Sequence, residues 1–228
     1  MISHPNVHVE EFILWVREFY GVDTRKLSSR WWGRLLQKMP FFKMVGIQLG
    51  SSIWINDVDN DHDGKRDYWH DEHPYGCISA ITHELWHVLQ KRTNKFARWR
   101  YLQPQVYALF MLPGFVWSAV VGSWLALLWG VLLLWFLMPG HASERLRLEA
   151  EAYSWNRLVV SLLTDHNLAA LALQQDEIIK VLTSGTYYWP TRQKGEAARF
   201  LEGYEGIPST EPILITQIKQ TIHEIKNN

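Results

Sequence analysis

The sequence predicts a mainly helical α+β fold, and three of its features support that prediction. Apolar residues recur at the three- and four-residue spacing of an amphipathic helix in several segments. A β-branched, glycine-punctuated stretch at 44–56 predicts a small sheet. Residues 106–138 carry no charge and predict a hydrophobic helical insertion. At 228 residues the chain has the length of one domain, so we expect 1–228 to fold as a single unit.

Two helices are expected before the sheet. The first covers 8–20 and ends at Gly21, because four apolar residues share one helical face. These residues are Phe12, Trp15, Val16 and Phe19. Residues 28–38 predict a second, basic helix that ends before Pro40. The Asp- and His-rich segment 57–74 predicts a loop after the strands.

Three longer helical patterns follow the loop. Residues 75–92 place several aliphatic side chains on one side of a helix, which we expect to be buried. Further helices are predicted at 142–164 and 213–226, on either side of shorter helical patterns. Most of the chain after residue 74 is therefore expected to be helical.

Composition narrows the classes of function. The 23 basic residues balance 23 acidic ones, whereas a general nucleic-acid binder normally has a basic surface, so no nucleic-acid partner is expected. The single cysteine, Cys77, excludes a disulfide framework and a multi-cysteine zinc site, and we expect it to be packed. The first residues lack the basic and apolar pattern of a secretory signal, so none is expected.

Residues 83–87, HELWH, match the zinc motif H-E-x-x-H. Residues four apart on a helix project from one face about 6 Å apart, so His83 and His87 can bind one zinc ion. Glu84 then reaches the open coordination position, where it can act as general base on the bound water. The pattern is typical of a zinc hydrolase; the alternative is a helix carrying two unrelated histidines.

Catalytic zinc usually takes three protein ligands, so one is still missing. A histidine at the metzincin spacing is excluded because Thr93 occupies that position. The predicted helix at 142–164 offers two carboxylates, Glu149 and Glu151. They project about 200° apart on a helix, so only one of them can face the metal.

Taken in order, the HELWH motif, the uncharged stretch and residues 149–153, EAEAY, resemble the gluzincin membrane peptidases. That group includes the CAAX prenyl proteases and the bacterial heat-shock membrane proteases. Its zinc helix is followed by a hydrophobic helical pair and then by E-x-x-A-D, whose Glu is the third ligand. The resemblance covers residues 83–155 and implies a zincin-like fold, peptidase activity and Glu149 as the third zinc ligand. Tyr153 departs from the family, which has a ligand-orienting Asp there.

Residues 115–138 would make a helix of about 36 Å, long enough to cross a bilayer once. One crossing would separate the histidines from Glu149, so we expect a helical hairpin within 104–139 that bends near 121–123. Its short arms suggest shallow membrane contact through 106–138. Basic residues on both flanks favour a membrane-associated protein with its active site on the cytoplasmic side. Burial of the hairpin in protein is the alternative.

Residues 59–67 match the calcium-loop pattern D-x-D-x-D-G-x-x-D. The oxygen donors would be Asp59, Asp61, Asp63 and Asp67. His70 stands at the twelfth position, where an EF-hand needs a bidentate Glu. A calcium site and a solvated hairpin tip are therefore both open.

We interpret the sequence as that of a zinc-dependent metalloendopeptidase acting on a peptide or protein substrate. The substrate could extend the sheet near residues 51–55. Four residues are candidates for the donor to the oxyanion: Tyr153, His166, Tyr187 and Tyr188. The alternatives are a non-catalytic membrane-associated or assembly protein with a structural zinc, and a calcium-loop binding module.

Overall fold

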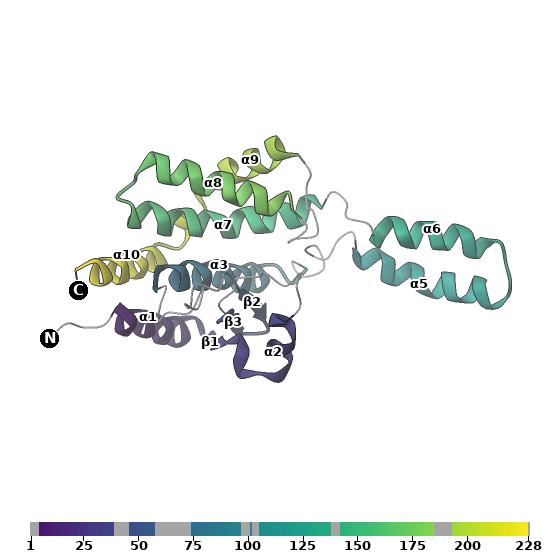
Figure 1. Ribbon diagram of the computed structural model, residues 1–228, viewed down its shortest axis with the longest axis horizontal. Coiled ribbons are helices and arrows are strands. Elements are labelled where there is room, and N and C mark those ends of the chain that lie inside the picture. Colours follow the sequence, from purple (N-terminus) through teal and green to yellow (C-terminus); the bar gives the residue numbers. More distant parts are fainter. Residues whose placement is uncertain are drawn as a thin grey trace.

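The computed structural model describes residues 5–38, 46–57, 74–96, 101, 105–137, 142–184 and 193–227. Within these ranges the chain is mainly helical and contains one three-stranded sheet, which confirms the predicted α+β class. Helices α3 (Pro74–Thr93) and α7 (Ser143–Leu163) pack side by side in the middle of the body (Figure 1). This packing brings the H-E-x-x-H motif of α3 close to the glutamates of α7.

Two groups of elements cover the central pair. Helices α1 (Pro5–Tyr20) and α10 (Pro212–Lys226) and the sheet lie on the α3 side, whereas α8 (Leu168–Leu182) and α9 (Lys194–Gly203) pack on α7 (Figure 1). Each group has its own buried apolar cluster, and Cys77 lies in the first, as predicted. A short 3₁₀ turn, η3 (Ile207–Thr210), connects α9 to α10.

Helix α1 buries a face slightly rotated from the predicted one. The buried positions are Val9, Phe12, Val16 and Tyr20, whereas Phe19 is 52% exposed. Trp15 and Phe19 lie at the edge of this face and stack on each other, with ring centroids 5.3 Å apart. Gly21 follows the helix at φ +64°, which accounts for its end there.

The sheet has the order β1-β3-β2. Strand β3 (Ser52–Ile55) pairs parallel with β1 (Asp23–Lys26) and antiparallel with β2 (Gly46–Leu49). The pattern at 44–56 predicted β2 and β3; the polar strand β1 was missed. Because β3 is the central strand, the expectation that a substrate adds at 51–55 is wrong. Within the described ranges, β1 and β2 are the edges of the sheet.

The predicted helix at 28–38 is wrong in its first part. A 3₁₀ turn, η1 (Leu27–Ser29), precedes the shorter helix α2 (Trp31–Gln37). The backbone N–H and hydroxyl of Ser28 both donate to the Asp57 carboxylate, which holds the turn against the end of β3. Tertiary hydrogen bonds therefore override the helical pattern at this point.

The uncharged stretch forms two helices, α5 (Gln105–Val120) and α6 (Leu125–Leu137), which project from the body as a hairpin (Figure 1). They join through a turn in which Gly122 has φ +66°, and Gly114 packs against the ring of Trp129. Within the described ranges, neither these helices nor any other is both long and apolar enough to cross a membrane.

Candidate metal centre

The packing of α3 against α7 brings three residues of the predicted site together. Nε2 of His83 lies 3.3 Å from Oε2 of Glu149, and Nε2 of His87 lies 3.5 Å from Oε1 of the same carboxylate. The candidate ligand atoms of the three residues all lie within 4.8 Å of one another. Glu149 is only 1% exposed, so its carboxylate is removed from water.

The geometry is compatible with one metal ion held by the three residues. Each imidazole Nε2 faces a different oxygen of the Glu149 carboxylate, at a separation that two ligand atoms of one ion can have. Among the described residues, Oε2 of Glu149 has no hydrogen-bond donor. A buried carboxylate oxygen without a donor is costly, and a cation between the imidazoles and the carboxylate would satisfy it.

The outer nitrogens of both rings contact side-chain amides. Nδ1 of His83 lies 2.9 Å from Oδ1 of Asn156, and Nδ1 of His87 lies 2.8 Å from Oε1 of Gln90. Amide partners of this kind orient metal-binding imidazoles and direct their Nε2 atoms inward. These supporting residues were missed in the sequence, although Gln90 is one turn after His87 and Asn156 two turns after Glu149.

The charges of the site shift the pKa values of its members. Burial acts to raise the pKa of Glu149, but the neighbouring His87 and His83 keep it well below its usual range. Burial acts to lower the pKa of His87, but the Glu149 carboxylate raises it to about 9. Without a metal the cluster is therefore a carboxylate paired with protonated imidazole, and a metal ion must displace that proton.

Glu84 lies on α3 beside the two histidines and is buried. Burial raises the pKa of its carboxyl; the charges of His83 and His87 oppose this effect, the charge of Glu149 adds to it, and the net shift is upward. A carboxyl with a raised pKa suits a general base that works near neutral pH. Strand β2 covers this residue at Gly46, whose missing side chain leaves room for the Glu84 side chain.

Two tyrosines line the histidines. The ring of Tyr153 packs edge-on against His83 at 4.6 Å, and that of Tyr101 lies 6.1 Å from His87. Burial, followed by the charge of Glu149 and a hydrogen bond to it, raises the pKa of Tyr101 well above its usual value. Tyr101 was missed because it belongs to no motif.

Other predicted residues do not join the cluster. Glu151, the alternative ligand, points instead to Gln90 and Arg147. His166 lies beyond the far end of α7 and contacts Ser161. The loop residues Asp59, Asp61, Asp63 and Asp67, together with Tyr187 and Tyr188, lie outside the described residues.

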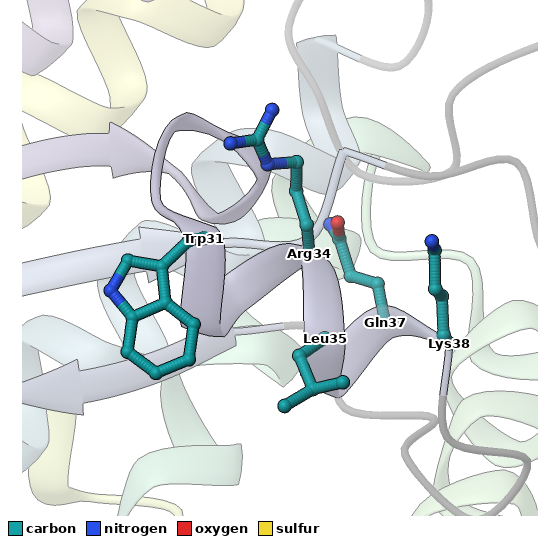
Figure 2. Close-up of a pocket in the computed structure, with 5 residues that line it drawn as sticks. All are labelled: Trp31, Arg34, Leu35, Gln37 and Lys38. Carbon is teal, nitrogen blue, oxygen red and sulfur yellow. The ribbon is translucent and has the colours of Figure 1, made fainter.

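A separate pocket of about 670 Å³ lies along α2 (Figure 2). Its described lining residues are Trp31, Arg34, Leu35, Gln37 and Lys38, which combine apolar and basic side chains and include neither a carboxylate nor an imidazole.

Comparisons of the chain with family models, curated proteins and solved structures returned no match. Its function must therefore be inferred from the residues and from their geometry.

Proposed function

We propose that the protein is a zinc-dependent metallopeptidase with a zincin-like arrangement of sheet, H-E-x-x-H helix and glutamate helix. One observation carries the proposal: the Glu149 carboxylate, from a helix distant in sequence, meets Nε2 of His83 and of His87 at 3.3 and 3.5 Å. Two histidines on a helix are common, but a buried carboxylate beside both of them completes the three-ligand set that catalytic zinc usually takes.

His83, His87 and Glu149 would hold the ion. Bound Zn²⁺ would supply a Lewis acid that polarises the scissile carbonyl and makes water a better nucleophile at neutral pH. Glu84 accepts the proton that the attacking water loses and delivers it to the nitrogen of the leaving amine. The raised pKa of Glu84 supports this role, because the carboxyl can then both take up and release a proton.

The substrate in this proposal is an extended peptide that pairs with β2. Within the described residues, β2 is hydrogen-bonded to β3 on one side only, so its other edge can accept a further strand. Gly46, in this strand, lies against Glu84. A peptide along this edge would therefore run beside the general base.

In this proposal, the α5–α6 hairpin contacts the membrane. Large apolar side chains along both helices and their turn are exposed, among them Trp117, Val120, Trp124 and Leu127, each at 70% or more. Contiguous exposed apolar surface of this kind is a feature of lipid- and protein-binding sites, and the absence of any charge over 106–138 favours lipid.

The Glu84→Gln variant tests the enzyme proposal. The amide cannot act as a base, so peptide hydrolysis should fall at least 100-fold while zinc content stays at the parent level. A library of unstructured peptides, with cleavage read by mass spectrometry, provides the assay. If the zinc-loaded parent cleaves no peptide, or if the Glu84→Gln variant cleaves as fast as the parent, the metal has a structural role and the peptidase proposal is wrong.

A further inference from the structure

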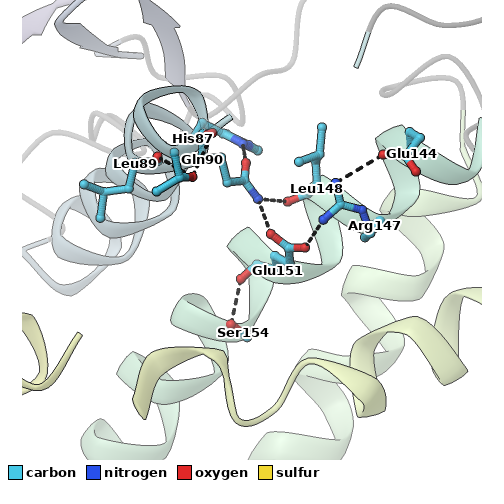
Figure 3. Close-up of polar contacts among 9 residues, drawn as sticks. His87, Leu89, Gln90, Glu144, Arg147, Leu148, Glu151 and Ser154 are labelled. Atoms are coloured by element: carbon cyan, nitrogen blue, oxygen red, sulfur yellow. Dashed lines mark hydrogen bonds and ion pairs between the residues drawn. The ribbon is translucent and has the colours of Figure 1, made fainter. Parts of the chain in front are cut away.

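Gln90 connects His87 to α7 (Figure 3). Its Oε1 lies 2.8 Å from Nδ1 of His87, and its Nε2 donates to the carbonyl oxygen of Leu148 at 3.1 Å and to Oε2 of Glu151 at 2.7 Å. Gln90 and Glu151 are both buried. One amide therefore contacts three groups in the interior.

The partners of this amide fix its direction. A carbonyl oxygen can only accept a hydrogen bond, so Leu148 must face the NH₂ group of Gln90. The carboxylate of Glu151, ion-paired with Arg147, accepts from the same NH₂ group. The amide oxygen of Gln90 is thereby left facing His87, and because this oxygen can only accept, Nδ1 of His87 must carry a proton.

We infer that Gln90 is a positioning residue that holds the His87 proton on Nδ1, so that the Nε2 lone pair faces Glu149 and the metal. The inference rests on the proposed zinc centre. It assigns a role to Glu151 as well: the carboxylate keeps the Gln90 amide from turning over. Arg147 in turn bridges Glu151 and Glu144, which holds the carboxylate in place (Figure 3).

The other histidine is held less strictly. Nδ2 of Asn156 donates to the hydroxyl of Ser79 at 2.8 Å, while Oδ1 faces His83. A hydroxyl both donates and accepts, so this amide would keep its partners in either direction. The contacts thus specify the proton position on His87 and leave it open on His83.

Two variants separate hydrogen bonding from packing. Gln90→Met keeps the length and apolar contacts of the side chain but removes both hydrogen-bonding ends. The double variant Gln90→Glu with Glu151→Gln exchanges the two groups: the new carboxylate still accepts from Nδ1, and the new amide donates to it and accepts from Arg147. The carbonyl oxygen of Leu148 loses its donor in both variants. We expect Gln90→Met to weaken zinc binding 10- to 100-fold, and the exchange variant to bind zinc more tightly than Gln90→Met, because Nδ1 of His87 regains an acceptor.

Nitrogen-15 NMR of the imidazoles gives a readout that packing alone would not change. In the zinc-loaded parent, His87 should show a protonated Nδ1 and a metal-bound Nε2. This measurement needs no variant, so it still tests the inference if Gln90→Met does not fold. Metal on Nδ1, or zinc affinity unchanged in Gln90→Met, would overturn the inference while the zinc centre stands. A parent protein that takes up no zinc would contradict the centre itself and this inference with it.

Discussion

Gly46 in β2 faces Glu84 in α3 so closely that a methyl group at position 46 would lie 3.2 Å from Cγ of Glu84. The same methyl group would lie 3.3 Å from Cδ1 of Ile55 and from the carbonyl oxygen of Trp54. A side chain at position 46 would therefore press on Glu84, Ile55 and the β3 backbone, and glycine relieves this close approach of the strand.

Gly46→Ala should displace the Glu84 side chain by a few tenths of an ångström. A general base works only when its carboxylate oxygen is correctly placed relative to the attacking water. We therefore expect kcat/KM for peptide cleavage to fall about tenfold, with zinc content unchanged. Gly203→Ala serves as the control, because position 203 has no neighbour in the way of a methyl group. Equal rates for the two variants would exclude the positioning effect.

The metal-free protein should lose stability as the pH rises from about 6.5 to 9. The folded-state pKa of His87 is about 9, above the ordinary value of 6.5, so the protonated ring stabilises the fold below pH 6.5. That contribution disappears as the pH rises through 9. Thermal unfolding at each pH should show a steeper decline in the parent than in His87→Ala, and zinc should reduce the decline by replacing the proton. A flat profile for the metal-free parent would refute the pairing of His87 with Glu149.

A charge on the hairpin should weaken membrane binding. Leu127 on α6 is 76% exposed, and Leu168 on α8 is 81% exposed, so the two form a matched pair. Leu127→Glu should lower binding to lipid vesicles at least tenfold, whereas Leu168→Glu should leave it unchanged. Vesicle co-sedimentation measures both. If the parent instead self-associates and does not bind vesicles, the apolar surface of the hairpin contacts a second copy of the chain and the membrane proposal is wrong.

Trp155 should be the most sensitive core position near the site. It is fully buried and packs against Trp86 at 5.7 Å, and its indole N–H has no partner among the described residues. Trp155→Ala should cost about 3–5 kcal/mol of unfolding free energy. Trp155→Phe should cost clearly less, because no hydrogen bond is lost. Denaturant unfolding measures both, with exposed Trp31→Ala as a control expected to change stability by about 0.5 kcal/mol or less.

The sequence predicted the parts of the fold that depend on local pattern. The apolar period at 75–92 matched α3 (Pro74–Thr93) within two residues at each end, and that at 142–164 matched α7. Strand β1 was missed because Asp23–Lys26 is polar and forms a strand only by pairing with β3. The helix expected from residue 28 was wrong because Asp57, distant in sequence, binds Ser28.

The residues of the candidate site could be predicted from the sequence to a similar extent. His83, Glu84 and His87 form a motif at helical spacing. Glu149 was implied only by the resemblance to the gluzincin membrane peptidases, with Glu151 as the alternative, and the structure places Glu149 beside both histidines. Gln90 and Asn156 also lie at helical spacing from the ligands, but only tertiary packing shows which amide faces which ring. Spacing identifies residues on one face, whereas hydrogen-bond direction depends on partners from another helix.

Zinc content measured on two variants tests the central claim most directly. Glu149→Ala removes the proposed ligand, and Glu202→Ala removes an exposed carboxylate of α9 that lies outside the cluster. We predict about one zinc per chain in the parent and in Glu202→Ala, and almost none in Glu149→Ala after dialysis against a weak chelator. Full retention of zinc by folded Glu149→Ala would contradict the proposed metal centre.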